Sequence, residues 1–185
     1  MDFSLTDEQL AFRETAERFS KEKLAPFYMD RDRDDGLDRN LVREMGALGL
    51  IGADLPEEFG GLGMGGVTTG VIAEAIAYGD MNVCYVQLLG SLMGQIIVRN
   101  ASADLAGEWV PKIVSGDAIV GLGLTEPRGG SDAANLQLRA AKVQGGYLLN
   151  GEKTSMSFAG GADAAVVFAR TGPADGGARA VSAFM

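Results

Sequence analysis

The chain of 185 residues contains no histidine and a single cysteine, Cys84. Without histidine, the commonest general base, Cys84 is a poor candidate for a catalytic nucleophile. It cannot form a disulfide within the chain, so we interpret it as a reduced, buried thiol, which favours a cytoplasmic location. Metal ligands do not cluster in the sequence, and we expect no metal site. A catalytic protein of this sequence is therefore expected to depend on an organic cofactor.

Positive charge is also scarce. The chain has 16 Lys and Arg against 25 Asp and Glu, a net charge of −9 at pH 7. Nucleic-acid binding needs basic patches, so we expect no nucleic-acid partner. Met1 to Leu5 has neither a basic nor a long apolar stretch, and we expect no signal peptide. The most apolar helix candidate, Met81 to Val98, is interrupted by Gln87, Ser91 and Gln95, which predicts a core helix and no membrane insertion.

The first two thirds of the chain predict helices. Thr6 to Gln9 is a capping-box pattern, followed by Phe12, Ala16 and Phe19 at helical spacing, and Pro26 ends or bends this helix. The charge run Asp30 to Asp35 is interpreted as a solvated linker, and Leu50 to Leu55 as a short apolar run and strand candidate. Further helices are predicted over Leu37 to Leu48, Val67 to Tyr78, Met81 to Val98 and Ala103 to Val114.

After Ser115 the hydrophobic period changes from about 3.6 to 2. Strands are predicted over Ala118 to Leu124, Leu136 to Lys142, Tyr147 to Lys153, Ala164 to Ala169 and Ala180 to Met185, with a hairpin turn at Gln144 to Gly146. The fold class is therefore α+β, with an all-α helical bundle domain over residues 1–117 and an incomplete antiparallel β domain over residues 118–185. Because the chain ends inside an expected strand, we expect either a longer protein or another element that covers this edge.

Two glycine-rich patterns resemble nucleotide-binding motifs. Gly61 to Gly66 contains G-x-G-x-x-G, but Pro56 to Phe59 separates it from the nearest strand candidate, so we interpret it as a tight connection between helices. Gly151 to Ser155 lacks the upstream glycine of a phosphate-binding loop. The adjacent Glu57 and Glu58 are interpreted as solvated loop acids.

The strongest functional signal is Gly123 to Asp132, where an apolar strand runs into a hydroxyl, an acid, a proline, paired glycines, and a second hydroxyl and acid. Such a turn offers backbone N–H groups and hydroxyl donors in one place. The hydroxyl-rich segment Thr154 to Ser157 follows the end of a neighbouring expected strand. Together the two segments predict a ligand site. The alternative is a structural turn in which Asp132 only caps the backbone.

At these residues the chain resembles the acyl-CoA dehydrogenases, a family of FAD-dependent enzymes. The resemblance rests on Leu5 to Gln9, Pro56 to Gly63, Gly123 to Asp132 and Asn150 to Lys153, in this order. It implies a helical N-terminal domain, a middle β-barrel domain and a C-terminal four-helix domain that is absent from this chain. It also implies FAD and an acyl-CoA in the cleft between the domains, an electron-transfer flavoprotein as electron acceptor, and a homotetramer.

The resemblance implies roles for particular residues. Leu122, Leu124 and Thr125 would hydrogen-bond the flavin ring, and Ser131 would lie near the flavin diphosphate and the pantetheine arm of the substrate. Ser155, Met156 and Ser157 would lie against the flavin, with Ser157 facing its N5 nitrogen. Tyr85, Gln87 and Leu88 would line the acyl pocket. In the family's reaction a carboxylate removes the α-proton while hydride leaves the β-carbon for the flavin, which gives a 2,3-enoyl-CoA.

The chain departs from the family in three ways. The family's catalytic glutamate belongs to the C-terminal domain, so this chain supplies contacts but no base and is expected to be inactive alone. Ser155 stands where a tryptophan is usual, and Asn135 where a small residue is usual. The Lys153 to Ser157 variant resembles members that act on cyclic substrates such as cyclohexanecarboxyl-CoA, in fatty or cyclic acid degradation. Two alternatives remain: a non-catalytic binding or assembly module of the same fold, and an acyl-CoA oxidase.

Overall fold

The first helix, α1 (Asp7–Phe19), begins at the predicted capping box. In this computed structural model, which describes residues 4–33 and 36–185, the Thr6 hydroxyl accepts from the Gln9 N–H at 3.2 Å and the Gln9 side chain accepts from the Thr6 N–H at 3.0 Å. The α-helical pattern then gives way to a π-helical turn, η1 (Ser20–Leu24), and a 3₁₀ turn, η2 (Ala25–Phe27). The change at Pro26 agrees with the predicted bend, because proline cannot continue the α-helical hydrogen bonds.

The prediction of a solvated linker at Asp30 to Asp35 is only half right for its described part: Asp30, Asp32 and Arg33 are exposed, but they are helical. Residues up to Arg33 belong to helix α2 (Tyr28–Arg33), while residues 34 and 35 lie outside the described residues. The Arg31 side chain is only 18% exposed, and its Nε donates to the carboxylate of Asp80 at 2.8 Å. A charge run is judged solvated from its composition, and composition does not show that one charge has a buried partner.

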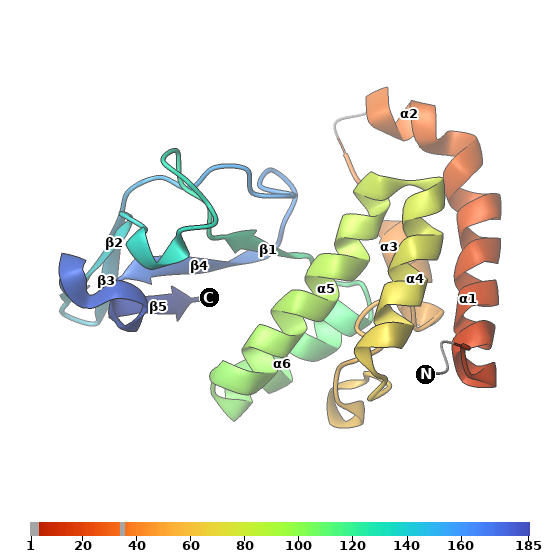
Figure 1. The fold of residues 1–185 in the computed structure, drawn as a ribbon, viewed down its shortest axis with the longest axis horizontal. Helices are drawn as coiled ribbons and strands as arrows, with labels where there is room; N and C mark the ends of the chain where they lie inside the picture. Colours follow the sequence, from red (N-terminus) through yellow and green to blue (C-terminus); the bar gives the residue numbers. More distant parts are fainter. Residues whose placement is uncertain (1–3, 34–35) are drawn as a thin grey trace. The chain divides into compact units, whose positions relative to one another are not determined.

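Four longer helices follow, close to the predicted ranges: α3 (Arg39–Ala47), α4 (Gly66–Gly79), α5 (Met81–Asn100) and α6 (Ala103–Val114). Helix α1 packs against α4, α4 against α5, and α5 against α6, and Figure 1 shows α4 between α1 and α5. By length and composition alone α5 could cross a membrane, but half of its most apolar stretch is buried in this unit, as in a core helix.

The apolar run Leu50 to Leu55 forms no strand, contrary to the expectation. It folds as buried turns beneath α5, where Ile51 lies against Gly90 and Leu55 against Gly94. These side chains fill the space between helices rather than cover one face of a sheet. The run therefore does not adopt the alternation of inward and outward side chains that a strand would have. The following glycines connect the short turn η3 (Glu57–Phe59) to α4, as predicted.

Close helix packing makes Gly46 sensitive to substitution. A methyl group added to Gly46 in α3 would lie 2.8 Å from the carbonyl oxygen of Val114 and closer still to the carbonyl group of Ser115. Backbone atoms cannot move aside cheaply, so Gly46→Ala is expected to lower the free energy of unfolding by about 3 kcal/mol. Gly70→Ala in α4 is the matched control, because it meets nothing within 4 Å. Alanine should stabilise α4 by up to about 1 kcal/mol there.

The fluorescence of Trp109, the single tryptophan, reports the unfolding of this helical unit. Equal midpoints for the two variants in a denaturant titration would contradict the steric account.

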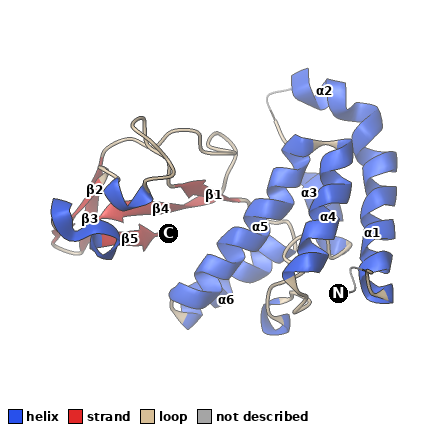
Figure 2. Cartoon of the chain, in the orientation of Figure 1, coloured by secondary structure: helices blue, strands red, loops and turns tan. Residues whose placement is uncertain are grey.

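The chain divides into two compact units, Met1–Ile119 and Val120–Met185, and the second carries the strands (Figure 2). They are β1 (Val120–Gly123), β2 (Arg139–Val143), β3 (Gly146–Asn150), β4 (Ala164–Arg170) and β5 (Val181–Phe184). The β2–β3 hairpin is antiparallel, as predicted. The sheet as a whole is mixed and open rather than an antiparallel barrel, because β4 runs parallel to β1 and β2 and antiparallel to β5. The α+β class is confirmed.

Candidate functional site

Two hydroxyl-bearing segments meet just beyond the end of β1. The Thr154 N–H donates to the Thr125 carbonyl oxygen at 2.9 Å, which joins the segment after β3 to the segment after β1. A methyl group added to Gly121 would contact the Met156 side chain and lie 3.4 Å from the Ser157 carbonyl oxygen. The structure therefore brings the predicted cofactor residues of β1 and its turn beside those of residues 155–157.

The loop from Glu126 to Leu138, called the signature loop below, leaves β1 through a tight turn. Glu126 and Gly129 exchange backbone hydrogen bonds of 3.1 and 3.0 Å. A methyl group on Gly130 would lie 3.0 Å from the Thr125 hydroxyl oxygen, so glycine keeps that hydroxyl uncrowded. Further on, the Asn135 side chain donates to the Asp132 carboxylate at 2.7 Å. Asn135 thus closes this turn of the signature loop through its side chain.

Donors of this region lack partners within the protein. In the part of the chain that the structure describes, neither the hydroxyls of Thr125, Ser131, Ser155 and Ser157 nor the N–H groups of residues 130–132 make a hydrogen bond. Ser131 and Ser155 are exposed, and Thr125 and Ser157 are half-buried. Hydroxyl and amide donors that the fold does not use remain available to an anionic or carbonyl-bearing ligand.

The backbone is strained beside these donors. Ser155 has φ +52° and Phe158 has φ +60°, the left-handed region that side chains other than glycine rarely adopt. Such strain costs about 1–3 kcal/mol per residue and occurs most often at functional sites. The strain supports a functional interpretation of the segment around Ser155.

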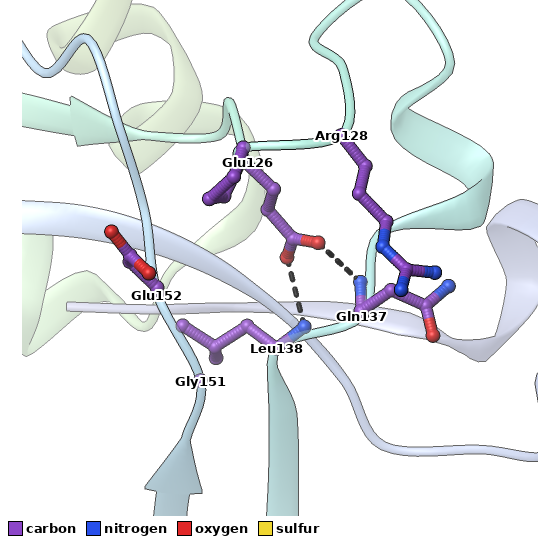
Figure 3. A pocket seen from close by; sticks show the side chains of 7 residues that line it. Glu126, Arg128, Gln137, Leu138, Gly151 and Glu152 are labelled. Atoms are coloured by element: carbon purple, nitrogen blue, oxygen red, sulfur yellow. Dashed lines mark hydrogen bonds between the residues drawn. The ribbon is translucent and has the colours of Figure 1, made fainter.

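Glu126 is a buried acid that sequence analysis did not single out. Its side chain is 7% exposed, and its carboxylate accepts a hydrogen bond from Lys153 Nζ at 2.9 Å. It also accepts from Leu138 N at 2.8 Å and Gln137 N at 2.5 Å, as Figure 3 shows. Burial raises the pKa of Glu126, but these three donors outweigh it and hold the pKa below its usual value. In the sequence, the position of this acid just beyond an apolar strand is the one sign that its carboxylate could be buried and bonded.

A cavity of about 290 Å³ lies beside the Glu126 carboxylate. Figure 3 shows Arg128 and Gln137 on one side of it and Glu152 on another. Arg128 has no ion-pair partner among the described residues. Because Lys153 and two backbone amides already bond Glu126, its carboxylate is not a free acid in this cavity.

The helical unit holds the three residues expected in the acyl pocket. Gln87 is fully buried, and its Nε2 donates to the Thr69 carbonyl oxygen at 3.4 Å. Gln87 therefore packs between α4 and α5 with its Oε1 buried and without a hydrogen-bond partner among the described residues, and its role in an acyl pocket stays a prediction. Tyr85 and Leu88 are exposed on α5, and their role stays a prediction.

Cys84 is buried, and burial raises the pKa of its thiol, which makes it a weak nucleophile. Among the described residues, no three or more metal-ligating side chains cluster together.

Residues 6–117 match the acyl-CoA dehydrogenase N-terminal domain, and residues 121–185 match the acyl-CoA dehydrogenase middle domain. Both matched domains are parts of acyl-CoA dehydrogenases, a class of oxidoreductases. The chain therefore belongs to the acyl-CoA dehydrogenase family, as its resemblance predicts.

Known relatives agree with this assignment. The chain is 37% identical over 173 residues to the benzylmalonyl-CoA dehydrogenase of Aromatoleum aromaticum, covering 93% of this chain and 46% of that protein. Its fold is similar to butyryl-CoA dehydrogenase from Megasphaera elsdenii, with TM-score 0.88 and 34% identity over 100% of this chain and 49% of the other. An FAD complex of PigA gives TM-score 0.90 and 31% identity, again over 100% and 49%. The chain thus spans about half the length of these relatives.

Proposed function

We propose that this chain forms the flavin- and thioester-contacting part of an FAD-dependent acyl-CoA dehydrogenase that converts an acyl-CoA into a 2,3-enoyl-CoA. The observation that carries the proposal is the set of unpartnered hydroxyl and amide donors where β1 meets the segment after β3. The part of such a site that holds a flavin and a polarised thioester needs fixed donors.

The donor set fits FAD. The free N–H groups of residues 130–132 and the Ser131 hydroxyl suit a diphosphate, which needs several donors in one place. The Thr125 and Ser157 hydroxyls suit the nitrogen and carbonyl acceptors of a flavin ring. Bound FAD would supply the hydride acceptor, and the residues of this chain would bind and orient it.

No acid of this chain is assigned as the base. Glu126 is the buried acid nearest the donor set, but the Lys153 ammonium and two amide N–H groups keep it ionised and occupied. A base must be free to reach the α-carbon of a substrate, and Glu126 is not. We therefore propose that the proton acceptor is a carboxylate outside these 185 residues.

The remaining assignments are also proposals: an electron-transfer flavoprotein as acceptor, a homotetramer, and a cytoplasmic location. For the substrate we propose a branched or ring-bearing acyl-CoA, supported by the similarity to a benzylmalonyl-CoA dehydrogenase and by the Lys153 to Ser157 variant. An acyl-CoA oxidase is the second candidate, favoured by the exposed Ser155 where the family has tryptophan. An oxidase would be distinguished from a dehydrogenase by rapid reoxidation of the substrate-reduced flavin by air.

Thr125→Val and Ser131→Ala test the donor assignment. Each removes one hydroxyl donor. A hydrogen bond to the charged diphosphate contributes about 1.5–3 kcal/mol, so we expect Ser131→Ala to bind FAD roughly 10- to 100-fold more weakly. A hydrogen bond to a neutral flavin acceptor contributes about 0.5–1.5 kcal/mol, so we expect Thr125→Val to bind FAD roughly 2- to 10-fold more weakly. The dissociation constant is measured by quenching of FAD fluorescence in the protein at its full encoded length. Thr171→Val is the control, because the Thr171 hydroxyl bonds Ser182 instead. Unchanged affinity in both test variants, or no FAD binding by the parent, would refute the proposal.

A further inference from the structure

The Glu126 carboxylate joins the two ends of the signature loop. Glu126 lies at the entry of the loop, and its two oxygens accept from the N–H groups of Gln137 and Leu138 at the exit, 11 and 12 residues later. Figure 3 shows both hydrogen bonds. Amide N–H groups form stronger hydrogen bonds with a carboxylate than with a neutral acceptor. The two ends of the loop are therefore joined by the Glu126 side chain rather than by strand pairing.

Lys153 connects this closure to the second hydroxyl-bearing segment. Its ammonium is 9% exposed and donates to Glu126 at 2.9 Å and to the Leu124 carbonyl oxygen at 3.0 Å. The neighbouring Thr154 N–H bonds the Thr125 carbonyl oxygen. One carboxylate and one ammonium thus hold together the end of β1, the exit of the loop and the segment that leads to Ser155.

The loop exit is also held from its carbonyl side. The Arg170 side chain is buried and donates to the carbonyl oxygens of Ala134 at 2.7 Å and Leu136 at 3.0 Å. The N–H groups at the exit therefore bond a carboxylate while the carbonyl groups bond a guanidinium. Between entry and exit, the N–H groups of residues 130–132 and the Ser131 hydroxyl bond nothing within the described protein. The ends of the loop are fixed and its middle is left for a ligand.

We propose that Glu126, charge-paired with Lys153, is the positioning residue that holds the signature loop in its ligand-binding form before the ligand arrives. The identity of the ligand as FAD rests on the proposed function, whereas the closure of the loop does not. A preformed loop spares the bound state the cost of ordering these residues, which raises affinity without any contact between Glu126 and the ligand.

Exchanging the two charges separates this role from that of a plain ion pair. Glu126→Lys combined with Lys153→Glu restores an ion pair, but it places an ammonium against the N–H groups of Gln137 and Leu138. We expect amide hydrogen exchange at Gly129, Asn135, Gln137 and Leu138, whose N–H groups are hydrogen-bonded, to accelerate at least tenfold in the ligand-free forms of this double variant and of Glu126→Gln. We expect FAD to bind at least tenfold more weakly to both.

Phe184→Ala is the matched control. Phe184 packs against the apolar core of the same sheet, which includes the Leu138 side chain, but it makes no hydrogen bond with Glu126, Lys153, Gln137 or Leu138. Its loss should therefore lower the melting temperature without accelerating exchange selectively in the loop. All variants are measured in the protein at its full encoded length.

Each outcome decides between the possibilities. If the charge-exchanged variant, or Glu126→Gln where that variant does not fold, keeps the parent's exchange rates at these four N–H groups, the proposal is overturned whatever the flavin result. Faster exchange with unchanged FAD affinity also overturns it. If exchange is faster in the variants but the parent protein binds no FAD, the positioning role stands and the proposed function is rejected.

Discussion

Replacing Asp80 with alanine is expected to lower the free energy of unfolding of the helical unit by about 3–5 kcal/mol. Asp80 is 2% exposed and serves two elements. Its carboxylate caps α5 by accepting from the N–H groups of Asn82 at 2.9 Å and Val83 at 3.2 Å. It also accepts from Arg31 Nε at 2.8 Å. Alanine removes the cap, worth about 1 kcal/mol, and leaves the largely buried Arg31 without its counter-charge.

Two further variants separate these contributions. Asp80→Asn can still cap α5, because asparagine is as good an N-cap as aspartate, so it should cost less than alanine and reveal the value of the charge. Arg43→Met removes the exposed pair with Asp117, whose side chains are 51% and 56% exposed, and should cost no more than about 1 kcal/mol. Denaturant titrations followed by Trp109 fluorescence measure all three. An Asp80→Ala cost as small as that of Arg43→Met would show that the buried pair contributes little.

The second large effect is expected in acid. Burial raises the pKa of Glu126, but Lys153 and the two amide donors lower it further, so the folded unit favours the ionised form. The stabilisation is therefore fully present above the unfolded-state pKa of about 4.3 and is lost as the pH falls through the lower folded-state pKa. Glu126→Gln leaves Lys153, at 9% exposed, without its partner and should cost the strand unit about 3–5 kcal/mol at pH 7.

The difference between the parent and Glu126→Gln should shrink as the pH falls through the acid range, because protonation removes the same charge from the parent. Amide exchange in β2, β3 and β4 at several pH values reports the stability of this unit. A difference that stays constant from pH 7 down to about pH 3 would mean that Glu126 does not make the acid-sensitive contribution assigned to it here.

The sequence predicted the elements whose signals are local. The capping box at Thr6 and the helix from Ala103 to Val114 depend on neighbouring residues, and the structure has both. The hairpin turn likewise depends on Gly145, which adopts φ +84°. The run from Leu50 to Leu55 misled the prediction because its environment is set by α5, a later and separate element. The environment of Arg31 is also set by a distant residue, since its partner Asp80 lies 49 residues further along the chain.

The candidate site shows the same division. The hydroxyls at Thr125 and Ser131 were visible because they stand in one short, unusual turn. The side chains that fix this turn were not visible, since Lys153 lies 27 residues beyond Glu126 and Arg170 lies 36 residues beyond Ala134. Gln87 was placed in an acyl pocket by the resemblance to the family, and the packing of α4 on α5 shows that its side chain is buried. Local chemistry therefore indicates a site, while its supports depend on tertiary pairing.

The most direct test of the central claim is the visible absorption spectrum of the FAD-loaded protein at its full encoded length. Linear, branched and cyclic acyl-CoAs are added one at a time without oxygen. The account predicts a bound-flavin spectrum that at least one acyl-CoA bleaches, with formation of the 2,3-enoyl-CoA. A protein that binds no FAD, or a bound flavin that no acyl-CoA reduces, would contradict the account and favour a non-catalytic module of the same fold.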